Sequence, residues 1–365
     1  MRTAARTGHT FIIGTSVRHR ERVTAYVRAL ILSGGGARGA YEAGVAISLL
    51  EQEDFEIICG ASIGAINGAL IAQGDLKELE RVWRSMASLG VIRLAPEIEA
   101  VAALVSDLHQ TDALPQRAAA ILKLYQLHSA ISANGDLTRL LGALSSEPVV
   151  QALANRLRFA WLKRTLVVST TNITRGTAEA FYHFAGFNKS EQEADFRASQ
   201  PASHRLTPDN YVPAVCASAA VPGAFQPVTI ATDEGTAHQY LDGSISNDLV
   251  SQAIDAGASD LTVIYMDRAD LRPPNVDLSS IADIGLAVQE IRQERILESD
   301  LRLCRTVNKA VLAGTAPGKR FVSIRTICPQ TPLRLSVIQF DDQELMDAAF
   351  DQGMHEGALL GKRAS

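Results

Sequence analysis

Cysteine is scarce in this chain of 365 residues. The four cysteines follow no Cys-x-x-Cys spacing, and Cys59 and Cys216 lie in apolar runs, where a buried free thiol is ordinary. Cys304 and Cys328 are just as isolated along the chain. The sequence therefore predicts neither a disulfide framework nor a zinc site, and it favours a reducing, cytoplasmic location.

Aromatic side chains and basic charge are also limited. Phe, Trp and Tyr together make up 5% of the residues, and the formal net charge is -5. Base stacking needs aromatic rings, and phosphate binding along a nucleic acid needs an excess of Lys and Arg. We therefore expect no nucleic-acid partner. The proportions of hydrophobic residues (47%) and charged residues (21%) are those of an ordinary globular enzyme.

The sequence lacks an apolar run suited to crossing a membrane. Its longest uncharged stretch, residues 210–232, is interrupted by three prolines, which a spanning helix would not tolerate. The apolar residues 11–13 are too few for a secretion signal. Residues 1–26 hold five arginines against the single acid Glu21, so we expect a disordered or loosely docked basic arm. A weak peripheral contact with an anionic membrane surface is the alternative role of this arm.

Two strand–turn–helix units follow one another near the start of the chain. Residues 27–33 predict a buried strand and residues 39–51 a helix, and residues 55–59 and 63–73 repeat this order. Successive units of this kind form a parallel sheet with crossover helices. The sequence therefore predicts an α/β fold.

The remaining pattern divides the chain into three parts. Residues 76–162 show helical spacing without a strand signal, and we interpret them as a helical insertion. Further strands are predicted at residues 165–171, 178–184, 228–231, 238–241, 261–266 and 321–327, and further helices at residues 249–256, 281–313 and 342–360. We expect the basic arm, a catalytic domain over residues 27–276, and a mostly helical extension over residues 277–365 that packs on it.

A serine stands at the apex of the second strand–helix turn. The turn reads Gly60-Ala61-Ser62-Ile63-Gly64, and small residues follow it. A Gly-x-Ser-x-Gly turn in this position is typical of a nucleophile elbow, in which Gly60 and Gly64 are needed because the backbone is crowded. Taken alone, the pattern also fits an ordinary small-residue turn before a tightly packed helix.

A glycine-rich turn closes the first strand and opens the first helix. Gly34, Gly35, Gly36, Ala37, Arg38 and Gly39 can expose several backbone N–H groups beside a helix N-terminus, which favours negative charge. One use of such a site is an oxyanion hole for attack by Ser62 on an ester. Arg38 would add positive charge there or lie on the surface.

The same glycines also satisfy the Gly-x-Gly-x-x-Gly pattern of dinucleotide sites. The acid that binds the ribose in such sites stands at the end of the second strand. Glu53 and Asp54 precede that strand, and Cys59 and Gly60 stand at its end. The nucleotide interpretation is therefore disfavoured, and we expect no cofactor and no metal.

Serine needs a base within hydrogen-bond reach to become nucleophilic. Asp242 precedes Gly243 at the end of a predicted strand, and a carboxylate near an apolar pocket can have a raised pKa and act as a base. An ordinary Asp-Gly hairpin corner is the alternative. His355 would fit the Ser–acid–His chain order of α/β-hydrolases, but it falls inside the predicted closing helix.

Four motifs, in this order, resemble the patatin-like phospholipase family: residues 34–39, 60–64, 217–225 and 242–243. The resemblance covers about residues 27–250 and implies a three-layer α/β/α fold with a mostly parallel central sheet. It implies a Ser–Asp dyad without histidine, with Ser62 as nucleophile and Asp242 as base. The family's oxyanion hole would correspond to the N–H groups of Gly35, Gly36 and, as a third candidate, Ala37. Ser244 departs from the Gly or Ala more usual at its position.

The function expected from this resemblance is hydrolysis of carboxylic esters in phospholipids or other acyl lipids through an acyl-enzyme. The partner is then an acyl lipid or ester, and the oligomeric state is not predicted. Two alternatives remain: acyl transfer to another alcohol by the same dyad, and a non-catalytic lipid-binding module. Nothing in the sequence resembles an added C2, ankyrin or secretory module.

Overall fold

The computed structural model describes residues 26–89, 123, 147–222, 225–232, 235–246, 248–266, 281–337 and 339–361. Apart from Tyr26, the predicted basic arm lies outside the described residues. Most of the predicted helical insertion, residues 90–146 except Lys123, lies outside them too.

A sheet in which most pairings are parallel runs through the described part of the chain. Seven of its strands lie in the order β5-β4-β3-β2-β1-β8-β9, while β7 pairs with β3 and β6 pairs with β7. Only the pairs β3–β4, β3–β7 and β6–β7 are antiparallel in this sheet as described. The strands are β1 (Arg28–Leu32), β2 (Ile57–Gly60), β3 (Thr165–Asn172), β4 (Thr177–His183), β5 (His204–Arg205), β6 (Val228–Ala231), β7 (Ala237–Asp242), β8 (Asp260–Ile264) and β9 (Ser323–Ile327).

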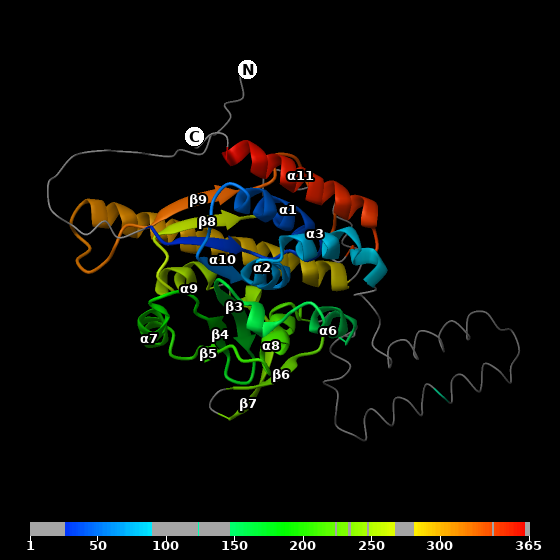
Figure 1. The fold of residues 1–365 in the computed structure, drawn as a ribbon, viewed down its shortest axis with the longest axis horizontal. Coiled ribbons are helices and arrows are strands. Elements are labelled where there is room, and N and C mark those ends of the chain that lie inside the picture. Colours follow the sequence, from blue (N-terminus) through cyan, green and yellow to red (C-terminus); the bar gives the residue numbers. More distant parts are fainter. Residues whose placement is uncertain are drawn as a thin grey trace, which may run out of the picture.

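Helices cover both faces of the sheet, which confirms the predicted three-layer α/β/α fold (Figure 1). Successive residues of a strand point to opposite faces. Leu30 and Leu32 of β1 pack with α1, α2, α8 and α11, whereas Ala29 and Ile31 pack with α9 and α10. The helices are α1 (Gly39–Leu50), α2 (Ile63–Gln73), α3 (Leu76–Arg84), α6 (Glu147–Ala154), α7 (Lys189–Ser199), α8 (Tyr211–Ser218), α9 (Leu249–Asp255), α10 (Ile281–Leu312) and α11 (Gln343–Gly361).

Several predicted elements fall where the sequence places them, and three elements were not predicted. The bounds of α2 and β6 are those expected. The unpredicted elements are α7, in which Phe196 alone is buried, the two-residue strand β5, and α8. Pro213 lies in the first turn of α8, where its missing N–H costs no intrahelical hydrogen bond. Among the described helices, none combines the length and apolar character needed to span a bilayer.

The C-terminal part of the chain shares the central sheet. β9 pairs in parallel with β8 at the edge of the sheet, and α11 packs along α1 (Figure 1). Short 3-10 helices are η1 (Gly36–Arg38), η2 (Met86–Leu89), η4 (Phe159–Trp161) and η5 (Gly243–Ile245). The predicted boundary at residue 276 lies outside the described residues, so the division into a catalytic domain and an extension stays a prediction.

Candidate active site

Strands β2 and β7 both pair with β3, and the carboxyl ends of β2 and β7 point towards each other. Asp242 is at the end of β7, and Ser62 follows closely after the end of β2. The parallel strand β2 ends opposite Val168, and the antiparallel strand β7 ends opposite Thr170. The carboxyl ends of both strands therefore face each other, separated along β3 by Ser169 alone. Asp242 is the last residue of β7, and Ser62 follows two residues after β2.

Ser62 adopts a strained backbone conformation, with φ 56° and ψ -133°, immediately before α2. Among the described residues, no other non-glycine residue has a positive φ. A Cβ on Gly60 would lie 2.3 Å from the carbonyl oxygen of Gly64, and one on Gly64 would lie 2.3 Å from that of Leu32. The turn therefore has no room for a side chain at position 60 or 64. A backbone conformation such as that of Ser62 costs roughly 1–3 kcal/mol, and such strained residues concentrate at functional sites.

The glycine turn lies directly against this elbow. Gly34, Gly35 and Gly36 have φ values of 84°, 152° and 58°, which glycine adopts without strain. A Cβ on Gly34 would lie 2.7 Å from Cβ of Ser62 and 2.8 Å from the carbonyl oxygen of Ala61. The glycine turn and the elbow therefore converge in the structure.

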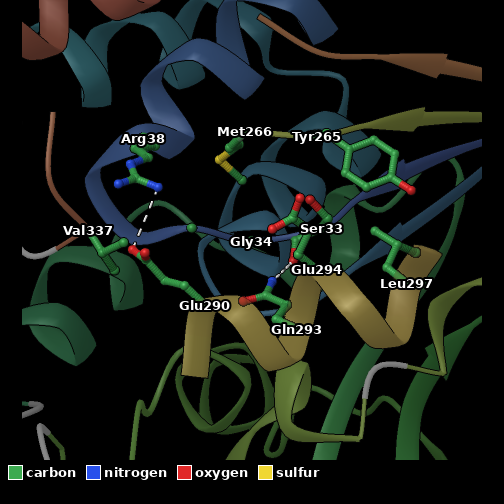
Figure 2. Close-up of a pocket in the computed structure, with 11 residues that line it drawn as sticks. Ser33, Gly34, Arg38, Tyr265, Met266, Glu290, Gln293, Glu294, Leu297 and Val337 are labelled. Atoms are coloured by element: carbon green, nitrogen blue, oxygen red, sulfur yellow. Dashed lines mark hydrogen bonds and ion pairs between the residues drawn. The ribbon is translucent and has the colours of Figure 1, made fainter. Parts of the chain in front are cut away.

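The C-terminal part of the chain holds the glycine turn from the other side. The N–H of Ala37 donates to the carbonyl oxygen of Val337 at 2.8 Å, so this group is already engaged. Arg38 donates from Nε to the carbonyl oxygen of Leu335 at 2.8 Å, and its Nη1 lies 3.6 Å from Oε1 of Glu290 on α10. Arg38 is therefore not free on the surface, and Figure 2 shows its ion pair with Glu290.

A small cavity of about 50 Å³ lies between the glycine turn and α10. Figure 2 shows Ser33 and Gly34 on one side of it and Glu290, Gln293 and Leu297 of α10 on the other. Gln293 donates from Nε2 to the carbonyl oxygen of Ser33. Ser62 and Asp242 do not line this cavity, so it lies beside the candidate site and not over it.

Asp242 is fully buried at the end of β7. Its Oδ1 accepts a hydrogen bond from the N–H of Ser244 at 2.8 Å, while Oδ2 has no partner of ordinary hydrogen-bond geometry among the described residues. Burial raises the pKa of this carboxyl to about 6, against the lowering effects of Ser244 and of the Ser62 side chain. Among the described residues, no hydrogen bond of ordinary geometry joins the Ser62 hydroxyl to this carboxylate.

A second buried carboxyl group lies beneath the glycine turn, and the sequence patterns did not single it out. Oε2 of Glu42 accepts a hydrogen bond from Asn67 Nδ2 at 2.8 Å, and Trp83 Nε1 donates to Oδ1 of Asn67 at 2.9 Å. Burial raises the pKa of Glu42 to about 8, although the hydrogen bond from Asn67 and the nearby backbone N–H groups of Gly34 and Ser33 oppose this. A charged residue inside an apolar helix was the signal that could have identified it.

The alternative bases and the nucleotide interpretation find no support in the geometry. His355 is exposed on α11, and among the described residues no histidine makes a hydrogen bond with Ser62. Glu53 pairs with Arg325, and Asp54 pairs with Arg164 at 2.9 Å. Both acids precede β2 and so lie at its amino end, whereas the glycine turn follows the carboxyl end of the parallel strand β1.

The described residues contain neither a cluster of metal-binding side chains nor a disulfide. Within the described ranges, no group of three or more His, Cys, Asp or Glu side chains is arranged to hold a metal ion. The four cysteines are free thiols, and three of them are buried.

A protein-family model matches more than half of the chain. The model of the family described as "Patatin-like phospholipase" matches residues 30–254. This range includes the glycine turn, the elbow and Asp242, and it supports a lipid acyl hydrolase in general terms. No curated protein matches the chain.

The solved structures found in the comparison are distant from this chain in sequence. VipD from Legionella pneumophila is 14% identical, with a TM-score of 0.39 over 93% of this chain and 67% of VipD. The type III effector protein ExoU is 15% identical, with a TM-score of 0.31 over 92% of this chain and 52% of ExoU. Full-length ExoU from the type III secretion system of Pseudomonas aeruginosa, in complex with SpcU, is 16% identical, with a TM-score of 0.25 over 74% and 52% of the two chains. The chain thus spans about half the length of ExoU.

Proposed function

Because this chain belongs to the patatin-like phospholipase family, we propose that it hydrolyses carboxylic esters of phospholipids or other acyl lipids with Ser62 as nucleophile and Asp242 as general base. The observation that carries the proposal is the end-to-end meeting of β2 and β7 on β3. This arrangement puts a strained serine, the last residue before a helix, beside a buried carboxyl group.

In the first half of the proposed reaction, the ester carbonyl is attacked by Ser62 Oγ while Asp242 takes the hydroxyl proton. Burial favours this transfer, because an Asp242 carboxylate with a pKa near 6 is a stronger base than an exposed aspartate and is still mostly ionised at neutral pH. Oδ2, which lacks a partner among the described residues, is the oxygen available to accept the proton.

Negative charge then develops on the former carbonyl oxygen. The N–H groups of Gly35 and Gly36 are the proposed donors, because the N–H of Ala37 is already bonded to Val337. Donors held in place before the reaction are effective, and loss of one typically costs about 100- to 1,000-fold in rate. The proton on Asp242 passes to the leaving alcohol, and a water activated by Asp242 releases the fatty acid from Ser62.

The test is a panel of phospholipids and nitrophenyl esters, run on the wild type and on Ser62→Ala. We expect wild type to release acid and the variant to lose at least about 1,000-fold of the activity. Ser251→Ala is the matched control, because Ser251 is an exposed serine on α9 and should keep full activity. Equal activity of wild type and Ser62→Ala would sink the assignment of the nucleophile.

Two further outcomes of the same panel separate the alternatives. An added alcohol that receives the acyl group in preference to water would identify an acyltransferase that uses the same dyad. Binding to lipid vesicles without acid release, together with no labelling of Ser62 by a fluorophosphonate, would identify a non-catalytic lipid-binding module.

A further inference from the structure

Ser218, the last residue of α8, lies between the two halves of the proposed dyad. We propose that Ser218 is a positioning residue: its hydroxyl holds the strained backbone of Ser62 and ties it to β3 beside Asp242. This role rests on the proposed function, because it concerns the geometry of the same reaction. Ser218 is fully buried and is not among the residues that the proposed reaction uses.

The hydroxyl of Ser218 makes one hydrogen bond in each direction. Its Oγ accepts from the N–H of Ser62 at 3.1 Å and donates to the carbonyl oxygen of Ser169 at 2.6 Å. Ser62 lies beyond the end of β2 at Gly60, so its N–H takes no part in the strand pairing. Among the described residues, Ser218 is the partner that satisfies this buried N–H group.

Ser169 is the β3 residue that separates the ends of β2 and β7. Its carbonyl oxygen also defines the position of the Asp-Gly turn, because a Cβ on Gly243 would lie 2.0 Å from it. Through Ser218, the backbone of Ser62 is thus linked to the carbonyl oxygen of Ser169. The turn after Asp242 packs against the same oxygen.

The turn that follows Ser218 holds Asp242 as well. The carbonyl oxygen of Ala220 accepts the N–H of Asp242 at 3.0 Å. Residues 218 and 220 therefore fix the main chains of both members of the dyad, from two adjacent points of one short segment. A hydroxyl at position 218 is needed because the link to Ser62 and Ser169 requires an acceptor and a donor on the same atom.

The test compares Ser218→Ala with Ser203→Ala. Ser203 is an equally suitable control because it is buried and its Oγ also accepts a backbone N–H, that of Ala180 at 3.3 Å, but away from the dyad. A misplacement of the nucleophile by about 1 Å can cost on the order of 100-fold in rate. For Ser218→Ala we expect kcat to fall about 10- to 100-fold with KM changed less than about threefold, and fluorophosphonate labelling of Ser62 to slow by a similar factor.

Ser203→Ala should lower the melting temperature by a similar amount and leave kcat within about twofold of wild type. If Ser218→Ala does not fold, Ser218→Cys serves instead, since the thiol keeps the size but hydrogen-bonds weakly. A Ser218 variant with kcat no lower than that of Ser203→Ala overturns the inference while the proposed function stands, provided that Ser62→Ala is inactive. Wild-type protein that neither hydrolyses esters nor reacts with the fluorophosphonate overturns both.

Discussion

Burial of Asp242 raises the pKa of its carboxyl group to about 6, and this value sets the lower pH limit of the proposed reaction. Only the ionised carboxylate can accept the proton of Ser62. We therefore expect kcat/KM to rise with pH between about 5 and 7, with a midpoint near 6, because kcat/KM reports the ionisation of the free enzyme. The measurement is a pH series with a nitrophenyl ester or a short-chain lipid.

Asp242→Asn identifies the group responsible for this midpoint. The amide cannot act as a base, so activity should fall by about 100- to 10,000-fold at pH 7, with no midpoint near 6 in what remains. A wild-type profile that is flat from pH 5 to 7, or a midpoint near 4 as for an exposed aspartate, would contradict the assignment of Asp242.

The single-residue features of the site differ in how far the sequence could predict them. Ser62 is recognisable locally, because the glycines that its strained turn requires are its neighbours in the chain. Asp242 is a candidate base from its place at the end of a predicted strand, but the residues alone leave an ordinary hairpin corner open, and the resemblance is what favours the catalytic role. Ser62 and Asp242 come together because the first half of β3 pairs with β2 and its second half pairs with β7. No local sequence pattern contains the register of these strand pairs.

At the level of elements, α1 and α11 pack with their backbones in close contact. A Cβ on Gly44 would lie 2.2 Å from the carbonyl oxygen of Phe350, and one on Gly353 would lie 2.2 Å from that of Tyr41. The hydroxyl of Tyr41 also donates to Oε2 of Glu356 at 2.9 Å. Because α1 begins immediately after the glycine turn, this helix pair determines where the turn lies.

We expect Gly353→Ala to lower the free energy of unfolding by about 1–3 kcal/mol, because the added methyl group forces the two helices apart. The gain in helix propensity, up to about 1 kcal/mol, offsets only part of this. Chemical denaturation of the purified protein gives the measurement, and ester hydrolysis should fall as well because the glycine turn shifts with α1.

The matched control for this helix is His355→Ala. His355 is exposed on α11, so its removal should change the free energy of unfolding by no more than about 0.5 kcal/mol and leave hydrolysis intact. The same variant tests the histidine alternative, since a catalytic His355 would make it inactive. Unchanged stability of Gly353→Ala would show that the helix contact is looser than described.

Elements were predictable where a repeating apolar pattern or a glycine turn marks them. The pattern of α2 begins at the elbow and that of α11 is sustained over many residues, and both helices were expected. α7 has a single buried residue, Phe196, so its sequence carries no apolar repeat. α8 was not predicted: the prolines in residues 210–232 were considered only as evidence against a membrane-spanning helix, and Pro213 falls in the first turn of α8, which accepts proline.

At the scale of the whole molecule, contacts between distant parts of the chain support the site, and the sequence could not predict them. Ala37 and Val337 are bonded through their main chains although 300 positions separate them. Gln293 of α10 reaches Ser33 in the same region. Main-chain groups are common to every residue type, so the first contact leaves no mark in the residue pattern. The second uses the side chain of Gln293, but no local pattern links this glutamine to Ser33.

The pH dependence of stability is also a property of the whole molecule, since it compares each carboxyl group in the folded and unfolded chain. Burial opposes ionisation of Glu179, but hydrogen bonds from His204, Asn172, Tyr240 and Thr177 outweigh it and lower the pKa to about 2. Glu179 therefore stabilises the folded chain at pH values above the ordinary glutamate pKa of 4.5. This stabilisation is lost as the pH falls from there towards 2. Glu42, with its pKa raised to about 8, acts in the opposite direction and in a separate pH range.

The contribution of Glu42 is fully present below about pH 4.5, where the carboxyl is neutral in both states, and is lost as the pH rises to about 8. Glu42→Gln keeps an uncharged side chain of similar size at every pH. We therefore expect this variant to gain stability relative to wild type between about pH 5 and 8, by on the order of a few kcal/mol, with a constant difference above pH 8. Urea denaturation of both proteins across this range gives the measurement.

Glu51→Gln, at the exposed end of the same helix, is the control and should show no such change. Parallel pH curves for Glu42→Gln and wild type would mean that Glu42 is charged in the folded protein at neutral pH. In that case a negative charge would lie beneath the glycine turn and oppose the oxyanion that the turn is proposed to stabilise. A growing advantage of the variant would instead show that the fold keeps this carboxyl neutral and leaves the positive end of α1 available to the substrate.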